Sequence, residues 1–209
     1  MKILAHRGHW LERVEMNSFH AFERAWSNGY GIETDLRDLD GAVVISHDPP
    51  ERGVRSLDEF LAAYAARGAG ALLALNIKAD GLQSAVAKAV GRHRVQNYFV
   101  FDMSVPDSLH YLRAGMPVFV RLSEYEQESS LLDRAAGVWL DAFEGEWWTL
   151  DTVRSLHVRG KTVAIVSPEL HKRPHEALWR TLKELGRETQ DALMLCTDFP
   201  DAASELFAG

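Results

Sequence analysis

The sequence predicts an α/β protein built as a (β/α)8 TIM barrel. Short apolar runs alternate with longer amphipathic runs, the alternation repeats eight times, and no linker or low-complexity segment interrupts the 209 residues. Eight consecutive units in a chain of this length favour a closed barrel and a single domain over residues 1–209. A doubly wound open sheet is the alternative fold. No Gly-x-Gly-x-x-Gly stretch follows the first apolar run, so the sequence gives no support for a dinucleotide site.

Capping and turn signals mark the ends of several elements. Ser18 is a preferred N-cap residue and Gly29 is a typical C-terminal stop, so a helix is expected between them. Ser56 and Glu59 have the spacing of a capping box, which predicts the start of a further helix. Asp40-Gly41 is a hairpin turn signal. We therefore expect a short β-hairpin as an addition to the second βα unit.

The remaining boundaries follow from the hydrophobic period. Strands are expected over 3–5, 30–36, 71–77, 98–101, 118–122, 137–140, 162–166 and 192–196, with the return strand of the hairpin over 42–46. Helices are expected over 18–26, 57–66, 82–90, from 106 onward, and over 126–134, 150–159, 175–185 and 202–207.

Composition limits the classes of function. The chain is 46% apolar and 25% charged, which is ordinary for a globular protein, and its net charge is -7 with a pI near 5.7. An acidic chain with scattered basic residues disfavours binding to nucleic acid or to an anionic membrane. The single cysteine, Cys196, excludes an internal disulfide and closes an apolar run, so we expect it in the core.

The sequence also gives an expectation for location. His6 follows Met1 too closely to leave room for a signal peptide ahead of it, and no apolar run approaches the ~20 residues that a transmembrane helix needs. We therefore expect a cytoplasmic enzyme without a stable membrane anchor. The oligomeric state is left open.

Five residues in the first quarter of the chain are suited to metal-assisted phosphodiester chemistry. Glu33 and Asp35 lie two positions apart on an expected strand, so their side chains share one face and can bind one Mg²⁺ or Ca²⁺ ion. His6 and His47 can supply the base and the acid that phosphoester cleavage needs. Arg7 can hold a phosphate through its fork of donors. The alternative is a solvated strand edge with two structural histidines.

These residues resemble the motifs of the glycerophosphodiester phosphodiesterase family, within the PI-PLC-like phosphodiesterase superfamily. The family hallmark is His-Arg-Gly after the first strand, Glu-x-Asp on the second and a following His-Asp, and the chain has all three in order, at 6–8, 33–35 and 47–48. The resemblance continues at 15–22 and at 197–200, so it extends over the whole chain.

The resemblance implies a role for each matched position. His6 and His47 are implied as the acid and base pair, Arg7 as a phosphate contact, and Glu33 with Asp35 as metal ligands. The family's third ligand is a Glu in a Glu-x-Lys motif, but the chain has Asn76-Ile77-Lys78 there. Asn76 can still offer a carbonyl oxygen to the cation, with weaker binding because one negative charge is missing. Lys78 remains available to contact a phosphate.

Other residues are weaker candidates. Asp102, Glu124 and Asp141 follow later expected strands and can compensate for the missing acid, although acids in loops are usually only solvated. Trp148, and similarly Trp10, can form part of a substrate platform, although such residues more often belong to a core.

The chain also lacks an expected segment. Many relatives carry a small inserted subdomain after the His-Asp motif, whereas only a few residues separate Asp48 from the helix expected at Leu57. The expected function is a metal-dependent phosphodiesterase acting on a glycerophosphodiester-like small molecule in lipid metabolism, with glycerol as the leaving group in doubt. The alternatives are a lyase-type phospholipase that forms a cyclic phosphate, similar to spider-toxin sphingomyelinase D, and a phosphoester-binding module with impaired catalysis.

Overall fold

The computed structural model describes residues 1–208, and its elements follow the order of a (β/α)8 barrel. Strands alternate with helical segments from β1 to α8, apart from β3 after β2 and α7 after α6, and the strand pairs within each unit are parallel except the pair of β2 with β3. The predicted fold class is confirmed. The chain divides into two compact units, described separately below: His6–Val118, the N-terminal unit, and Met1–Ala5 with Phe119–Gly209, the C-terminal unit.

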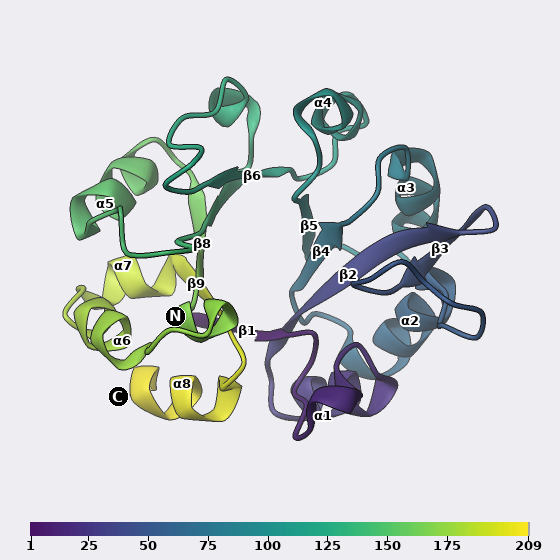
Figure 1. Ribbon diagram of the computed structural model, residues 1–209, viewed down its shortest axis with the longest axis horizontal. Helices are drawn as coiled ribbons and strands as arrows, with labels where there is room; N and C mark the ends of the chain where they lie inside the picture. Colours follow the sequence, from purple (N-terminus) through teal and green to yellow (C-terminus); the bar gives the residue numbers. More distant parts are fainter. Residues whose placement is uncertain (209) are drawn as a thin grey trace. The chain divides into compact units, whose positions relative to one another are not determined.

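The N-terminal unit contains three parallel strands in the order β5-β4-β2, with helices packed beside them (Figure 1). Val118 ends the unit in a parallel bridge to Val100. Its strands are β2 (Gly31–Leu39), β4 (Leu73–Ile77), β5 (Tyr98–Phe101) and the antiparallel β3 (Ala42–Ile45). Its helices are α1 (Phe19–Ser27), α2 (Leu57–Ala63), α3 (Gln83–Arg92) and α4 (Val105–Arg113), with a 3-10 turn, η1 (Arg13–Glu15), and a π turn, η2 (Tyr64–Gly68).

The C-terminal unit contains a parallel arrangement in the order β1-β9-β8-β7-β6. Its strands are β1 (Lys2–His6, of which Lys2–Ala5 belong here), β6 (Phe119–Leu122), β7 (Gly137–Leu140), β8 (Thr162–Val166) and β9 (Leu193–Thr197). Its helices are α5 (Leu150–Val158), α6 (Glu176–Lys183), α7 (Arg187–Asp191) and α8 (Pro200–Phe207), with 3-10 turns η3 (Leu132–Arg134) and η4 (Pro168–His171). Cys196 is buried within β9.

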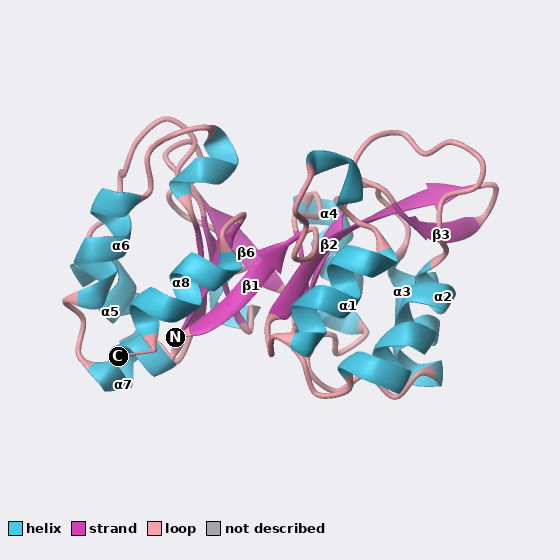
Figure 2. Ribbon diagram, turned by 90° about the horizontal axis from the view of Figure 1, so that it is seen from below, coloured by secondary structure: helices cyan, strands magenta, loops and turns pink. Residues whose placement is uncertain are grey.

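Capping and turn chemistry agree with the sequence. The hydroxyl of Ser18 accepts the N–H of Ala21 at the start of α1, and Ser56 with Glu59 forms the reciprocal capping box of α2. Asp40 and Gly41 both have positive φ, 50° and 84°, which a two-residue hairpin turn of this type requires. Figure 2 shows the β2–β3 hairpin extending above α2 and α3.

The helix predicted over 126–134 is not formed, and only η3 is helical in this range. Ser123 exchanges two backbone hydrogen bonds with Glu126, and its hydroxyl accepts the N–H of Tyr125. The hydroxyl of Ser129 accepts the N–H of Leu131. Short polar side chains thus give the backbone local partners that compete with helical hydrogen bonding. The spacing of the apolar residues carries no information about this competition, so it predicted a helix here.

An aromatic cluster joins α1 and α2 of the N-terminal unit. The ring of Phe22 packs edge-on against Phe60 at 4.8 Å and lies 6.2 Å from Trp26. Phe22 and Phe60 are fully buried, and side chains of this size contribute much of the apolar surface that a small core removes from water. The cluster holds the start of α1, and with it the β1–α1 loop. Among residues 1–208, no helix is long and apolar enough to cross a membrane.

Candidate functional site

Strand β2 presents two carboxylates at buried positions. Glu33 and Asp35 are each 1% exposed and point to the same face because they are two residues apart. Buried carboxylates require charged or hydrogen-bonding partners. Asp35 Oδ2 accepts the side-chain amide of Asn17 at 3.0 Å and lies 3.1 Å from Arg7 Nε. Asp35 Oδ1 lies 3.7 Å from Lys78 Nζ. The carboxylate of Asp35 is therefore surrounded by donors.

Glu33 has fewer partners and a perturbed charge. Its Oε1 accepts the side-chain amide of Asn76 at 3.0 Å, and its Oε2 accepts the main-chain N–H of Arg7 at 3.3 Å. His6 Nε2 lies 3.9 Å from the same Oε2. Burial raises the pKa of Glu33, and the neighbouring charge of Asp35 raises it further, against the opposing effects of His6 and Lys78. This carboxylate would be stabilised as an anion by a cation placed beside it.

Strand β4 brings Asn76 and Lys78 to the same position. Asn76 is the register partner of Asp35 in the β2–β4 pairing, and Lys78 follows two residues later on the same face. Lys78 Nζ also donates to Asp102 Oδ2 at 3.2 Å. Asp102 follows β5 with φ of 72°, in the left-handed region. Three adjacent strands therefore deliver polar side chains to one place at their carboxyl ends.

The β2–β3 hairpin positions His47. Ser46 donates its main-chain N–H to Asp35 O at 3.0 Å, so the pairing continues past β3 up to His47. Arg37 Nε donates to the His47 carbonyl at 2.7 Å, and Asp48 Oδ1 lies 2.9 Å from His47 Nδ1. The His47 side chain is 41% exposed. The carboxylate of Asp48 orients the ring and leaves the second ring nitrogen, Nε2, for other contacts.

The β1–α1 loop follows an unusual backbone path. Arg7 and Gly8 have φ of 57° and 87°, and a Cβ at Gly8 would lie 2.9 Å from Ala21. Asn17, with φ of 59°, donates its N–H to the Arg7 carbonyl and accepts the Thr34 hydroxyl. Asn17 thereby links the loop to both Arg7 and β2. The sequence argument assigned Asn17 no role, although the family resemblance at 15–22 contains it.

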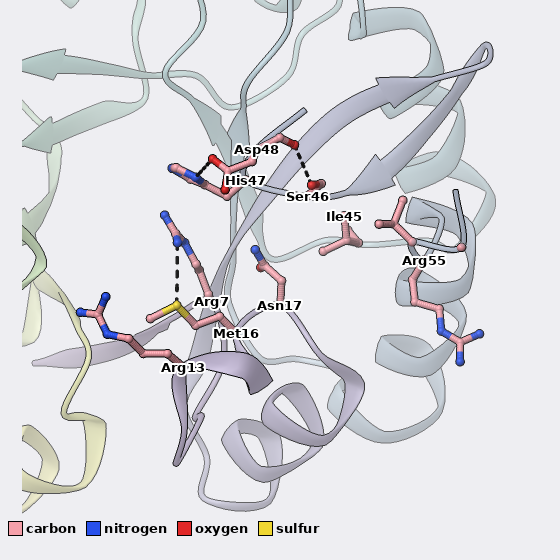
Figure 3. A pocket seen from close by; sticks show the side chains of 11 residues that line it. Arg7, Arg13, Met16, Asn17, Ile45, Ser46, His47, Asp48 and Arg55 are labelled. Carbon is pink, nitrogen blue, oxygen red and sulfur yellow. Dashed lines mark hydrogen bonds and ion pairs between the residues drawn. The ribbon is translucent and has the colours of Figure 1, made fainter. Parts of the chain in front are cut away.

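A cavity of about 460 Å³ lies beside these residues in the N-terminal unit. It is lined by Arg7, Asn17 and His47, among others, and Arg7 and Asn17 point towards His47 in Figure 3. A volume of this order falls within the range of small-molecule pockets. His47, a candidate base or acid, and Arg7, a candidate phosphate contact, thus line a space that can admit a small ligand.

Four further predicted residues are absent from the lining of this cavity. Trp10 lines no part of this cavity and donates its indole N–H to the His6 carbonyl at 3.0 Å. Trp148, Glu124 and Asp141 belong to the C-terminal unit. Trp148 is buried, Glu124 accepts two backbone N–H groups of 143–144, and Asp141 Oδ1 lies 2.7 Å from His171 Nε2. Asp141 was predicted from the sequence, whereas its partner His171 was not.

Glu33, Asp35 and Asn76 form the set of donors that a divalent cation would meet on β2 and β4. Among residues 1–208, no group of three or more His, Cys, Asp or Glu side chains is arranged to hold a metal. With an amide included, Glu33, Asp35 and Asn76 offer three oxygen donors, and Asn76 Oδ1 and Asp35 Oδ1 are buried without a hydrogen-bond partner. A rotation of the Asn76 amide exchanges its N and O, placing an oxygen about 3 Å from Glu33 Oε1, the separation of neighbouring ligands around a hard cation. The set fits such an ion.

Comparison with solved structures identifies the fold. A glycerophosphodiester phosphodiesterase from Agrobacterium tumefaciens str. C58 is similar over 100% of both chains, with a TM-score of 0.73 and 17% identity. One from Thermotoga maritima matches over 98% of this chain and 97% of its own, with a TM-score of 0.67 and 19% identity. The chain has the glycerophosphodiester phosphodiesterase fold.

The fold is also shared with a phosphatidylinositol-specific phospholipase C. A Ca²⁺-dependent phosphatidylinositol-specific phospholipase C from Streptomyces antibioticus matches over 98% of this chain and 95% of its own, with a TM-score of 0.56 and 13% identity. No family model matches the sequence, and no curated protein matches it either. At these identities the glycerophosphodiester phosphodiesterase fold is shared, and the chemistry must be argued from the residues.

Proposed function

We propose that the protein is a metal-dependent phosphodiesterase that cleaves a glycerophosphodiester-like small molecule by acid–base catalysis with two histidines. The observation that carries the proposal is the pair of buried carboxylates on β2, with His6 beside Glu33 and His47 at the end of the hairpin strand that pairs with β2. His6 lies 3.9 Å from Glu33, and His47 directly follows the residue that is hydrogen-bonded to the Asp35 main chain. The shared fold supports the proposal.

The cation would be held by Glu33, Asp35 and Asn76. When bound, it would neutralise charge on the phosphate oxygens and make the attacking hydroxyl more acidic. Two carboxylates and one amide carry one negative charge less than three carboxylates, so we expect weaker binding than an all-carboxylate set would give. Oxygen donors favour Mg²⁺ or Ca²⁺ over softer metals.

Arg7 and Lys78 would orient the phosphate. Arg7 Nε is held by Asp35, which leaves the terminal nitrogens of the guanidinium for a bidentate contact with phosphate oxygens. Lys78 is 19% exposed between Asp35 and Asp102, so it balances their charge before substrate binds and offers its ammonium group to a phosphate oxygen afterwards.

The histidines would move the protons of the reaction. One histidine takes the proton from the attacking hydroxyl as its oxygen bonds to phosphorus. The other gives a proton to the alkoxide oxygen as the phosphorus–oxygen ester bond breaks, so one proton is taken up and one delivered per cleavage. The attacking hydroxyl is that of water in a hydrolase and that of the substrate's neighbouring carbon in a lyase, which forms a cyclic phosphate.

The proposal is tested with purified protein, glycerophosphodiesters and an aryl phosphodiester, in Mg²⁺, Ca²⁺ or chelator. Cleavage by the wild type, lost in chelator and in His6→Ala and Glu33→Ala, is the expected result. Phosphorus NMR of the product distinguishes hydrolysis from formation of a cyclic phosphate. Binding of metal and diester without cleavage identifies the binding module instead. Equal inertness of wild type and variants towards every diester contradicts the proposed activity.

The proposal extends to the alcohol portion of the substrate and to a cytoplasmic location. Only eight residues, 49–56, separate Asp48 from α2, so the chain has no inserted subdomain there. The alcohol attached to the phosphate therefore meets a cavity formed by two loops, and its identity depends on the residues that line them. The single cysteine supports a reducing compartment such as the cytoplasm.

A further inference from the structure

The cavity beside His47 is basic in a chain that is acidic overall. Three arginines, Arg7, Arg13 and Arg55, line it together with His47, whereas Asp48 is the single acid in its lining. The whole chain carries a net charge of -7. A concave surface with the opposite sign from the rest of the molecule concentrates ligands of the complementary charge. The charge of the lining therefore points to an anionic ligand.

Two of the three guanidinium groups are available for such a ligand. Arg55 donates to Glu59 at 3.1 Å and stacks over the ring of Phe19, and Figure 3 shows it pointing away from the cavity. Arg7 meets Met16 through its Nη1, 3.8 Å from a thioether sulfur, which is a weak acceptor. Arg13 is exposed, and its side chain makes no hydrogen bond or ion pair with residues 1–208.

The short turn that carries Arg13 is held in place. Arg13 begins η1, and the last residue of that turn, Glu15, accepts from Arg24 Nη1 at 3.0 Å and from the main-chain N–H of Leu11 at 2.8 Å. Asn17, two residues after the turn, donates to the Arg7 carbonyl at 2.9 Å. The two arginines are thus carried by one braced loop, and Figure 3 shows Arg13 beside Met16, on the side away from Arg55.

Arg7 alone satisfies what the proposed reaction requires of this loop, because one guanidinium fork matches one phosphate group. Arg13 adds a second guanidinium at the same cavity, and this one has no side-chain hydrogen bond or ion pair with residues 1–208. A volume of about 460 Å³ exceeds the space that a single phosphate occupies, so the cavity also has room for an alcohol portion attached to it.

We propose that this cavity binds an alcohol portion of the substrate that carries a second anionic group, a phosphate monoester or a carboxylate, and that Arg13 contacts that group. The inference rests on the proposed function, since it places the scissile phosphate at Arg7 and His47. The substrate class is then a phosphodiester with an additional negative charge on one alcohol.

The test compares three matched ligands by titration calorimetry. Each is a glycerol phosphonate diester, in which a methylene group replaces the scissile oxygen, and its terminal position carries a hydroxyl, a carboxylate or a phosphate. We expect the wild type to bind the charged ligands about tenfold more tightly than the hydroxyl ligand, which corresponds to one charge-assisted contact. The tighter of the two charged ligands identifies the anionic group.

Three variants assign the preference to Arg13. Arg13→Ala should lower the ratio of affinities between charged and hydroxyl ligands about tenfold, Arg13→Lys should retain part of it, and Arg13→Glu should reverse it. Arg113→Ala is the matched control, because it removes an exposed arginine of α4 that does not line the cavity. Thermal unfolding of each variant verifies that the exposed substitution leaves the fold intact.

The outcomes separate this inference from the proposed function. Equal affinities for all three ligands, or a ratio unchanged in Arg13→Ala, overturn the second anionic group. If the corresponding phosphate diesters are nevertheless cleaved, the phosphodiesterase proposal stands without it. A preference that depends on Arg13, with no cleavage of any diester, supports the anion site and contradicts the catalytic proposal. Failure to bind any of the three phosphonates overturns the second anionic group, and cleavage of the corresponding phosphate diesters then decides the phosphodiesterase proposal.

Discussion

The side-chain amide of Asn76 donates to Glu33 Oε1 over 3.0 Å, at the point where β4 runs beside β2. Asn76 therefore occupies the place of a third acid and acts there as a donor to one carboxylate. Its own oxygen is buried without a hydrogen-bond partner. In the absence of a cation, this arrangement avoids the repulsion that a third buried carboxylate would add. The site then has less negative charge with which to bind a cation.

Asn76→Glu should strengthen metal binding. A third carboxylate adds charge to the donor set, so we expect the affinity for Ca²⁺ or Mg²⁺ to rise about tenfold or more, measured by calorimetry. In chelator the same variant should unfold at a lower temperature, because three buried carboxylates repel one another. Asn76→Ala is the control and should weaken binding. Unchanged affinity in both variants would place Asn76 outside the donor set.

Lys78→Met should lower stability in the absence of metal. The substitution keeps the apolar stem and removes the ammonium group that faces Asp35 and Asp102. We expect the free energy of unfolding in urea to fall by about 1–3 kcal/mol, below the full cost of a buried unpaired charge because Lys78 is partly exposed. Lys88→Met, on the exposed side of α3, should change it by less than about 0.5 kcal/mol. Equal effects would contradict a specific role for Lys78.

Glu15→Gln should give a pH-dependent loss of stability. The hydrogen bond from Arg24 lowers the pKa of Glu15 from 4.5 to about 2. A folded-state pKa below the unfolded value means that the carboxylate stabilises the protein above pH 4.5 and loses this effect as the pH falls towards 2. The free energy of unfolding, measured by urea titration, should therefore be higher for the wild type than for the variant at neutral pH. The two values should converge as the pH falls from 4.5 towards 2. Glu12→Gln, at an exposed position of the same loop, is the control for the substitution itself.

Gly8→Ala should be strongly destabilising. Gly8 has φ of 87°, and a Cβ there would approach Ala21 at 2.9 Å and Phe22 at 3.0 Å. Left-handed backbone and overpacking together should cost about 2–4 kcal/mol in the free energy of unfolding. Gly29→Ala is a matched control, because Gly29 has φ of 77° with open space around it, and it should lose only about 1–2 kcal/mol. Equal losses of unfolding free energy in the two variants would contradict a packing contribution at Gly8.

The two histidines should differ in their dependence on the leaving group. An aryl alcohol leaves without a proton, whereas an alkyl alcohol needs one, so removing the general acid should harm only alkyl diesters severely. Of His6→Ala and His47→Ala, the variant that retains cleavage of an aryl diester identifies the acid. The other should lose both activities by about 100-fold or more. Equal losses of both activities in both variants would contradict separate acid and base roles.

Much of the N-terminal unit was predictable from local rules. The alternation of side chains along a strand placed Glu33 and Asp35 on one face, and the preference of Asp-Gly for positive φ predicted the hairpin that brings His47 back to β2. These features depend on neighbours in sequence. Their prediction needed no knowledge of tertiary contacts, and the structure agrees with them.

Features that depend on distant contacts escaped prediction. Asn17 is distinguished only by its tertiary contacts with Thr34 and Asp35. The lack of a side-chain partner for Arg13 among residues 1–208 likewise depends on the folded arrangement of the chain. The helix expected over 126–134 failed because serine hydroxyls bind the backbone locally, a choice that amphipathic spacing does not encode.

The two-residue turn at Asp40-Gly41 controls more than the direction of the chain. It sets the register in which Leu36 faces Ile45, and hence how far His47 stands from Asp35 along the paired strands. A strand displaced by a single residue presents its opposite face, so one inserted residue in this turn would move His47 to the other face of the hairpin without changing any residue of the proposed site. The placement of His47 thus depends on the length of a turn that contains none of the proposed site residues.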